Sequence, residues 1–155
     1  MSEIEYQNIE GFPSQNLLKK IVEINQDVFG FGETAENLSK ALSGRHHLLT
    51  CLAFEDDRLV GFKIGFEERP HYFESWRGGV LQSHRGQGIA KKLLENQHEW
   101  CKNKGFRIVT TITNNTNISM LIVNLRGGFE IVGTIFDRRN HVKVHLQKWL
   151  VPIPD

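Results

Sequence analysis

The residues Arg85, Gly86, Gln87 and Gly88, within the sequence SHRGQGIAKKLL, combine residue types that are suited to holding a phosphate-containing ligand. They precede a predicted helix, and a helix N-terminus exposes unpaired backbone N–H groups and the positive end of the helix dipole. The glycines permit a tight turn and a close approach of ligand to backbone, and the arginine supplies a fixed positive charge. A diphosphate is the ligand best matched to several adjacent N–H donors, so the segment is predicted to bind one.

Two other kinds of phosphate-binding loop do not fit this segment. A Walker loop has a lysine and a Ser or Thr directly after its last glycine, whereas Ile89 and Ala90 follow Gly88 here. The dinucleotide-binding fingerprint requires a small residue at position 91, which is Lys91. A glycine-rich turn between a strand and a helix that binds no ligand is the remaining alternative.

The hydrophobic pattern predicts the elements that position this segment. Apolar residues at helical spacing begin at Ile89 and end before Gly105, and residues 46–68 read as two strands joined by a turn at 55–58. Thr34 and Gly44 mark the beginning and the end of a short helix. The order is β-α-α-β-β-β-α-β-α-β-β, a mixed α/β sheet, with elements at 2–9, 13–29, 33–44, 46–55, 58–68, 73–82, 89–104, 106–113, 117–128, 129–136 and 141–150.

Composition restricts the classes of function. The 155 residues are expected to form one domain, 1–155, and the net charge of +1 indicates neither a nucleic-acid nor a membrane partner. The sequence shows no apolar run of membrane-spanning length and no N-terminal leader. Cys51 and Cys101 are isolated, which favours buried thiols in a reducing, cytoplasmic compartment. His141 and His145 lie too far apart along one strand to bind one metal ion, and His46, His47 and His98 are expected at the surface, so no metal site is predicted.

Two segments carry a resemblance to a known family. The sequence VLQSHRGQGIAKKLL resembles the signature Arg/Gln-x-x-Gly-x-Gly/Ala of the GNAT superfamily of acetyl-CoA-dependent N-acetyltransferases, with Arg85, Gly88 and Ala90 at the defining positions. The sequence NISMLIVNLRGGF is similar to that family's Asn-x-x-Ala-x-x-x-Tyr…Gly-Phe segment, with Asn117, Gly128 and Phe129 in register. The predicted order of elements agrees with the family as well, so the resemblance extends over nearly the whole chain.

The resemblance implies a fold and a cosubstrate. The fold would be a mostly antiparallel central sheet flanked by helices, in which strands 73–82 and 106–113 form a splayed parallel pair. Acetyl-CoA would bind with its pantetheine arm between these two strands and its pyrophosphate on residues 85–90, and an amine would attack the thioester directly. The implied cofactor-binding residues are Gly78, Val80, Leu81, Arg85, Gly86, Gln87, Gly88, Ile89, Ala90, Asn117 and Met120.

The resemblance also indicates candidate catalytic residues. Glu74 occupies a strand position at which some members carry a glutamate base, and apolar neighbours such as Phe73 and Trp76 would raise its pKa. A solvated carboxylate is the alternative for Glu74, and His71 is the second candidate base. The family usually has a tyrosine acid at the position of Asn124, which could still donate a hydrogen bond to the departing thiolate. Tyr72 is a possible substitute acid, and Met120 replaces a usually small residue.

Three hypotheses of function follow. The first is an N-acetyltransferase that acts on a primary amine of a small molecule or peptide, and the second is a catalytically weak module that binds CoA or an acyl-CoA. The third is a structural domain that binds a partner through exposed aromatic residues, namely Tyr72, Phe73 and Trp76. The sequence does not identify the acceptor, and the family resemblance makes a homodimer through the C-terminal strands an expectation.

Overall fold

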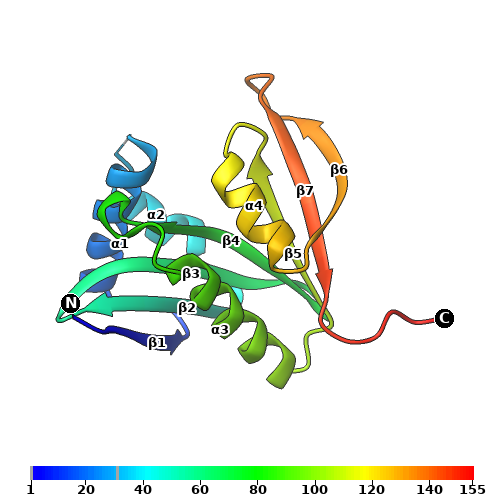
Figure 1. Ribbon diagram of the computed structural model, residues 1–155, viewed down its shortest axis with the longest axis horizontal. Helices are drawn as coiled ribbons and strands as arrows, with labels where there is room; N and C mark the ends of the chain where they lie inside the picture. Colours follow the sequence, from blue (N-terminus) through cyan, green and yellow to red (C-terminus); the bar gives the residue numbers. More distant parts are fainter. Residues whose placement is uncertain (1, 31) are drawn as a thin grey trace.

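In the computed structural model, which describes residues 2–30 and 32–155, seven strands form one sheet in the order β1-β2-β3-β4-β5-β7-β6 (Figure 1). Of the pairings between these strands, only that of β4 with β5 is parallel, so the predicted mostly antiparallel fold is confirmed. The strands are β1 (Ile4–Glu10), β2 (His46–Glu55), β3 (Arg58–Arg69), β4 (Tyr72–Val80), β5 (Ile108–Asn114), β6 (Glu130–Phe136) and β7 (Val142–Trp149).

Four helices of the described chain lie between these strands in the predicted order: α1 (Gln15–Phe29), α2 (Ala35–Leu42), α3 (Ile89–Asn103) and α4 (Ile118–Arg126). Ser14 and Thr34 cap α1 and α2 by accepting hydrogen bonds from backbone N–H groups of the first turn. Helix α3 instead follows Gly88, an N-cap residue that has a φ of 79° and provides no side-chain cap. The first turn of α3 therefore keeps N–H groups without an intrahelical or capping partner, as the sequence predicts.

The helices cover opposite faces of the sheet. A Cβ added to Gly79 would meet Ile24 and Val28 of α1, whereas one added to Gly61 would meet Ile89 and Leu93 of α3. In Figure 1, α1 and α2 lie behind the sheet, and α3 and α4 lie in front of it. A ligand that passes between two strands of this sheet would therefore connect the two helical layers.

Aromatic side chains fill the core between α3 and the sheet. Phe73 is fully buried, with its ring centroid 5.2 Å from that of Phe106 and 5.8 Å from that of Trp100. Gly65 gives it room, because a Cβ there would come within 2.3 Å of the Phe73 ring. Phe73 is thus a core residue and not an exposed aromatic, and Tyr72 and Trp76 are half-buried, so the surface assumed for a partner-binding domain is not formed.

Polar side chains are buried on the α3 side of the core, which the sequence analysis did not expect. His98, predicted at the surface, is buried, and its Nδ1 lies 3.1 Å from Lys148 Nζ. Burial, followed by the charges of Lys148 and Lys63, lowers the pKa of His98 to about 3, so its imidazole is neutral at physiological pH. Gln97 interrupts the apolar pattern of α3 but is fully buried. Cys51 and Cys101 are buried and free, as predicted.

The C-terminal edge of the sheet is unusually apolar. Every residue of β6 is exposed, and Ile131, Val132, Ile135 and Phe136 have between 50% and 70% of their surface accessible.

Among the described residues, no helix is long and apolar enough to cross a membrane.

Candidate active site

The strands β4 and β5 separate in the middle of the sheet. They pair only at Tyr72–Ile108, Phe73–Val109 and Glu74–Thr110, and the ladder between them ends there. At this point β4 contains an irregularity, because Ser75 pairs with Gly65 and Arg77 pairs with Ile64, which leaves one extra residue in β4. The predicted splayed pair is therefore present, although its strands begin and end at slightly different residues than predicted.

One contact closes the narrow end of this gap. Thr111 Oγ1 donates a hydrogen bond of 2.8 Å to the carbonyl oxygen of Ser75, and both residues are buried. Beyond this contact β5 continues to pair with β7 as far as Asn114–Lys143, whereas β4 has no ladder partner on its β5 side. Backbone N–H and C=O groups of β4 on that side are thus free to bind a ligand.

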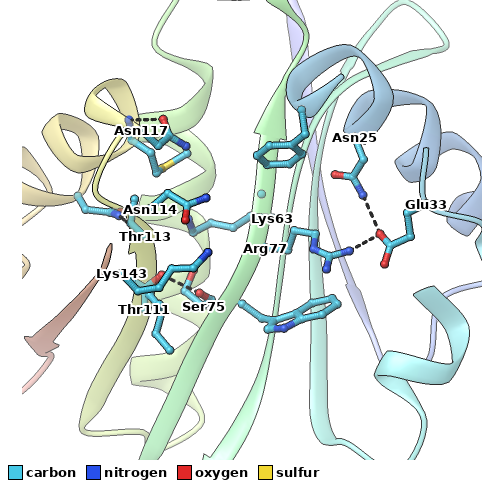
Figure 2. Close-up of a pocket in the computed structure, with 16 residues that line it drawn as sticks. Asn25, Glu33, Lys63, Ser75, Arg77, Thr111, Thr113, Asn114, Asn117 and Lys143 are labelled. Atoms are coloured by element: carbon cyan, nitrogen blue, oxygen red, sulfur yellow. Dashed lines mark hydrogen bonds and ion pairs between the residues drawn. The ribbon is translucent and has the colours of Figure 1, made fainter. Parts of the chain in front are cut away.

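A first cavity, of about 290 Å³, lies at the gap between the strands (Figure 2). We refer to it as the inter-strand cavity. Side chains from six elements and from the loop after α1 line it, and most of them are polar. They include Asn25, Glu33, Lys63, Ser75, Arg77, Thr111, Thr113, Asn114, Asn117, Met120, Asn124 and Lys143.

A second cleft, of about 400 Å³, extends from the same gap to the N-terminus of α3. We refer to it as the loop cleft. It shares Phe29, Gly78, Asn117 and Met120 with the inter-strand cavity, so the two spaces adjoin. Its other lining residues include Val28, Gly79, Val80, His84, Arg85, Gly86, Gly88, Ile89, Ala90, Lys91, Ser119, Val123 and Arg126.

The structure brings nine of the eleven predicted cofactor-binding residues to this continuous space. Leu81 is buried and Gln87 is exposed, and neither lines it. Gly86 and Gly88 both have a φ of 79°, and a Cβ on either would meet no atom within 4 Å. Glycine is thus required there for the backbone conformation rather than for space. Sequence reasoning missed Lys91 and Arg126, which add two cations to the loop cleft.

Asn117 and Asn124 have defined structural contacts on α4. The Asn117 side chain caps the helix by accepting a hydrogen bond of 3.3 Å from the backbone N–H of Met120. Asn124 is 2% exposed and donates through Nδ2 to Thr113 Oγ1 at 3.3 Å, while its Oδ1 has no partner among the described residues. An amide so placed can donate one further hydrogen bond into the inter-strand cavity, but it has no acidic proton.

The structure does not bring the other candidate catalytic residues to the cavity. Glu74 lies outside both sets of lining residues, and burial, together with the charge of Glu68, raises its pKa against the opposing charge of Arg45. Its neighbour Phe73 points to the opposite face of the strand, toward α3, so it cannot contribute to this shift as expected.

His71 and Tyr72 also stand away from the cavity. His71 is exposed in the turn before β4, where its φ is 74° and its carbonyl accepts hydrogen bonds from Arg107 and Ile108. The Arg69 guanidinium lies 3.8 Å from the centre of the Tyr72 ring. Neither side chain lines the cavity or the cleft.

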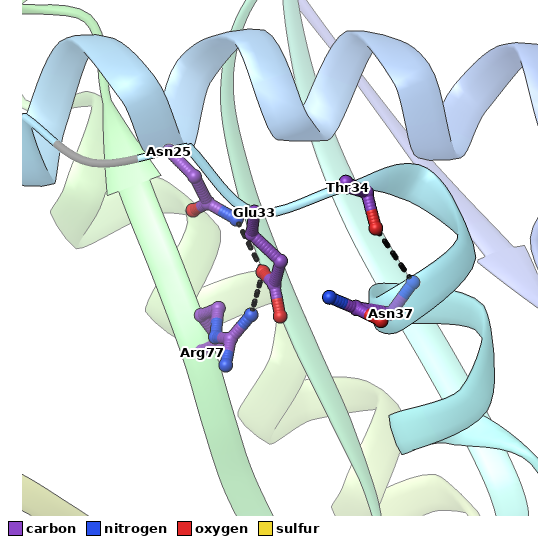
Figure 3. Close-up of polar contacts among 5 residues, drawn as sticks. All are labelled: Asn25, Glu33, Thr34, Asn37 and Arg77. Atoms are coloured by element: carbon purple, nitrogen blue, oxygen red, sulfur yellow. Dashed lines mark hydrogen bonds and ion pairs between the residues drawn. The ribbon is translucent and has the colours of Figure 1, made fainter.

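A partly buried ion pair shapes the α1 side of the inter-strand cavity (Figure 3). Arg77 Nη1 donates to Glu33 Oε2, and Asn25 Nδ2 donates to the same oxygen at 3.4 Å. The Arg77 guanidinium also lies 4.1 Å from the centre of the Trp76 ring. Because Arg77 and Glu33 are 28% and 18% exposed, this pair presents both signs of charge to the cavity in a fixed geometry.

The continuous cleft, which runs from the glycine loop before α3 to the gap between β4 and β5, is suited to a long, phosphate-bearing ligand. The family model described as acetyltransferase (GNAT) family matches residues 18–121. The chain therefore belongs to the acetyltransferase (GNAT) family, as its sequence signature suggests. No curated protein sequence matches it significantly.

Solved structures share the fold along nearly the whole chain. Ard1 from Thermoplasma volcanium superposes with a TM-score of 0.81 at 13% identity, covering 95% of this chain and 99% of that one. The ribosomal-protein-S18-alanine N-acetyltransferase from Escherichia coli gives a TM-score of 0.78 at 12% identity, covering 96% and 97%. The structure of yncA from Salmonella typhimurium, which contains its cofactor acetyl-CoA, gives a TM-score of 0.73 at 15% identity, covering 96% of each chain. At these identities the likeness shows the fold alone.

Proposed function

We propose that this chain, as one unit of residues 1–155, transfers an acetyl group from acetyl-CoA to a primary amine. The observation that carries this function is the continuous space from the glycine loop of α3 to the gap between β4 and β5. Such a space accommodates an extended cosubstrate with its anionic end at the loop and its reactive end inside the sheet. Two solved structures of this fold, yncA from Salmonella typhimurium with acetyl-CoA and the paia N-acetyltransferase from Thermoplasma acidophilum with coenzyme A, support the identity of the cosubstrate.

The loop cleft has the chemistry to hold the anionic end of acetyl-CoA. The backbone N–H groups of residues 85–90 and the dipole of α3 favour the pyrophosphate, and Arg85 is the first positive charge beside it. Lys91 and Arg126 offer further charges to the phosphates. The pantetheine amides then bind the backbone groups of β4 near Gly78 and Val80, which β5 leaves unpaired.

At the reactive end, a backbone N–H of β4 polarises the thioester carbonyl and stabilises the tetrahedral oxyanion. The attacking amine must first lose a proton, because the reference pKa of an alkylamine is about 10.4. We assign this proton to Glu74, which takes it through a water molecule since its carboxyl lies outside the cavity lining. Asn124 donates a hydrogen bond toward the departing sulfur.

The direct test is turnover. The purified protein is incubated with acetyl-CoA and a panel of amines (polyamines, lysine-containing peptides and peptides with free N-termini), and thiol release is measured with the mass of each product. We expect release only when an amine is present, together with a product heavier by one acetyl group. Saturable binding of acetyl-CoA without an acetylated product from any amine would instead support the CoA-binding module.

A homodimer through the C-terminal strands stays a prediction. The exposed apolar side chains of β6 are where a second copy would bind, and light scattering of the purified chain would measure its oligomeric state.

A further inference from the structure

Lys63 is a buried lysine within an apolar strand. It lies between Phe62 and Ile64 in β3, is 8% exposed, and pairs with Gly78 of β4. Because Gly78 has no side chain, the Lys63 side chain can pass beside it: a Cβ at Gly78 would lie 3.4 Å from Lys63 Cγ. Lys63 lines the inter-strand cavity, and Figure 2 shows it directed into the space between β4 and β5.

Lys63 has no carboxylate partner among the described residues, which is unusual for a buried cation. Burial lowers its pKa to about 8, and the Cys51 thiol is a smaller opposing influence. Retaining such a residue costs stability, since an apolar side chain would suit its surroundings better. The titratable and charged groups that face it from the packed elements and across the cavity are Cys51 of β2, His98 of α3, Lys148 and Lys143 of β7, and the Arg77–Glu33 pair.

We propose that the Lys63 ammonium group protonates the sulfur of coenzyme A as it leaves. When the tetrahedral intermediate collapses, the carbon–sulfur bond breaks and the electron pair goes to sulfur. One Nζ proton moves to the thiolate, which leaves CoA as the thiol and Lys63 as a neutral amine that solvent then reprotonates. Lys63 has this role only if the chain carries out the acetyl transfer proposed above.

The other candidate acids are less well placed. Asn124 lines the same cavity, but an amide does not release a proton, and one of its N–H groups is already directed to Thr113. Tyr72 lies outside the cavity. Lys63 combines access to the cavity with a pKa near that of a thiol, about 8.5, so proton transfer between them is close to balanced.

Free coenzyme A tests this role without any acceptor. Calorimetry measures its binding, and the ultraviolet absorbance of the thiolate follows ionisation of the bound thiol; Cys51 and Cys101 do not interfere because burial raises the pKa of both. An adjacent positive charge favours the ionised form of an acidic group and lowers its pKa, by about 1–3 units for a carboxyl beside an arginine. We therefore expect the bound thiol to ionise about one pH unit or more below the thiol bound to Lys63→Met. Lys148→Met, which removes a lysine outside the cavity lining, should retain the low value.

The outcomes separate the two proposals. If wild type and Lys63→Met bind CoA and give the same thiol pKa, the role of Lys63 is wrong while acetyl transfer stands. If the wild type does not bind CoA, both are wrong. Should Lys63→Met fail to fold, the wild-type complex is compared with CoA in solution, and an unshifted thiol pKa overturns the role.

Kinetics give the second readout. With any acceptor found, wild-type kcat should fall above pH 8, where Lys63 loses its proton. In Lys63→Met this alkaline fall should be absent and kcat about 100-fold lower, with little change in the affinity for acetyl-CoA. A lower kcat with the alkaline fall unchanged would show a merely structural effect and overturn the assignment.

Discussion

The loop cleft and the inter-strand cavity adjoin but are built in different ways. Much of the loop cleft comes from one short stretch, residues 78–91, which offers backbone groups and positive charges. The inter-strand cavity takes single side chains from α1, β3, β4, β5, α4 and β7, among them Asn25, Lys63, Arg77, Asn124 and Lys143. A site made of contiguous backbone leaves a local signature in the sequence, whereas a site assembled from distant side chains does not.

This difference separates the part of the site that would bind the cosubstrate phosphates from the part that would select the acceptor. Phosphate binding by helix N–H groups requires only a backbone conformation, which Gly86 and Gly88 supply. In the proposed function, recognition of an acceptor would depend instead on which charges the distant elements present, such as the Arg77–Glu33 pair. Substitutions at the two ends should therefore affect different kinetic constants.

The largest effect is expected for Gly88→Glu. Position 88 requires a positive φ, which a residue with a Cβ rarely adopts. The glutamate also places an anion where the cosubstrate phosphates are proposed to bind. Affinity for acetyl-CoA should therefore fall at least about 100-fold, roughly 2.7 kcal/mol. Calorimetric titration with acetyl-CoA measures this loss. Gly105→Glu is the matched control, because Gly105 ends the same helix with a φ of 91° and also has no atom near its Cβ position.

The control variant should carry the same backbone strain and added charge but bind acetyl-CoA as the wild type does. If both variants lose affinity equally, strain in α3 explains the effect and the loop is not the phosphate site. If neither loses affinity, acetyl-CoA does not bind at the loop cleft.

The sequence predicts the order of elements and most of the loop cleft because these depend on local rules. Ser14, Thr34 and Gly105 mark helix ends by capping chemistry, and the structure confirms the predicted helices at all three. The glycine loop needs only the conformations of four consecutive residues. The extra residue in β4 that helps to separate it from β5 has no such local signal, since it depends on the partner strand β3.

The burial of the interior polar residues was not predicted, because it depends on the assembled sheet rather than on local sequence rules. A lysine in the apolar run LVGFKIGF and a histidine on α3 both read as surface groups when only local periodicity is considered. Lys63 is buried beside Gly78, and His98 is buried against Phe129 and Lys148. Both environments are properties of the assembled sheet. The lysine inside an otherwise apolar strand was the available signal.

Glu74 lines neither the loop cleft nor the inter-strand cavity. Glu74→Gln should therefore change proton transfer from the amine without changing the binding of acetyl-CoA. Without the carboxylate, kcat should fall about tenfold near neutral pH, and the loss should shrink toward pH 10 as more of the amine is free. In the wild type, activity should fall with decreasing pH through the raised pKa of Glu74. A pH profile of kcat/KM measures both effects, and affinity for acetyl-CoA should not change.

The stability of the fold independently tests the direction of the Glu74 pKa shift. A carboxyl whose pKa is raised in the folded state destabilises the fold once it ionises, so Glu74→Gln should not lower the melting temperature at pH 7.

Glu68→Gln is the matched control for the pH profile of activity, because the charge of Glu68 helps to raise the Glu74 pKa. This variant should move the acidic fall in activity to lower pH and leave the rate at high pH unchanged. An identical profile in wild type and Glu74→Gln would place the base elsewhere.

The smallest effects are expected at the ion pair of the inter-strand cavity. Arg77→Met leaves Glu33 as an unbalanced negative charge, and Glu33→Gln leaves Arg77 as an unbalanced positive charge. Both residues line the part of the inter-strand cavity where we propose that the acceptor binds. A charge change of this kind is worth about 1 kcal/mol, or about fivefold in affinity. The two variants should therefore move the acceptor KM about fivefold in opposite directions, with affinity for acetyl-CoA unchanged.

The direction of these shifts would also identify the acceptor's charge. A carboxylate-bearing amine should bind more weakly to Arg77→Met and more tightly to Glu33→Gln, whereas a polycationic amine should show the reverse. If both variants instead weaken acetyl-CoA binding, the α1 side of the inter-strand cavity also holds the cosubstrate, and the assignment of the Arg77–Glu33 wall to the acceptor is wrong. Steady-state kinetics with the acceptor varied at saturating acetyl-CoA, beside calorimetric titration with acetyl-CoA alone, distinguish these results because each measures one end of the cleft.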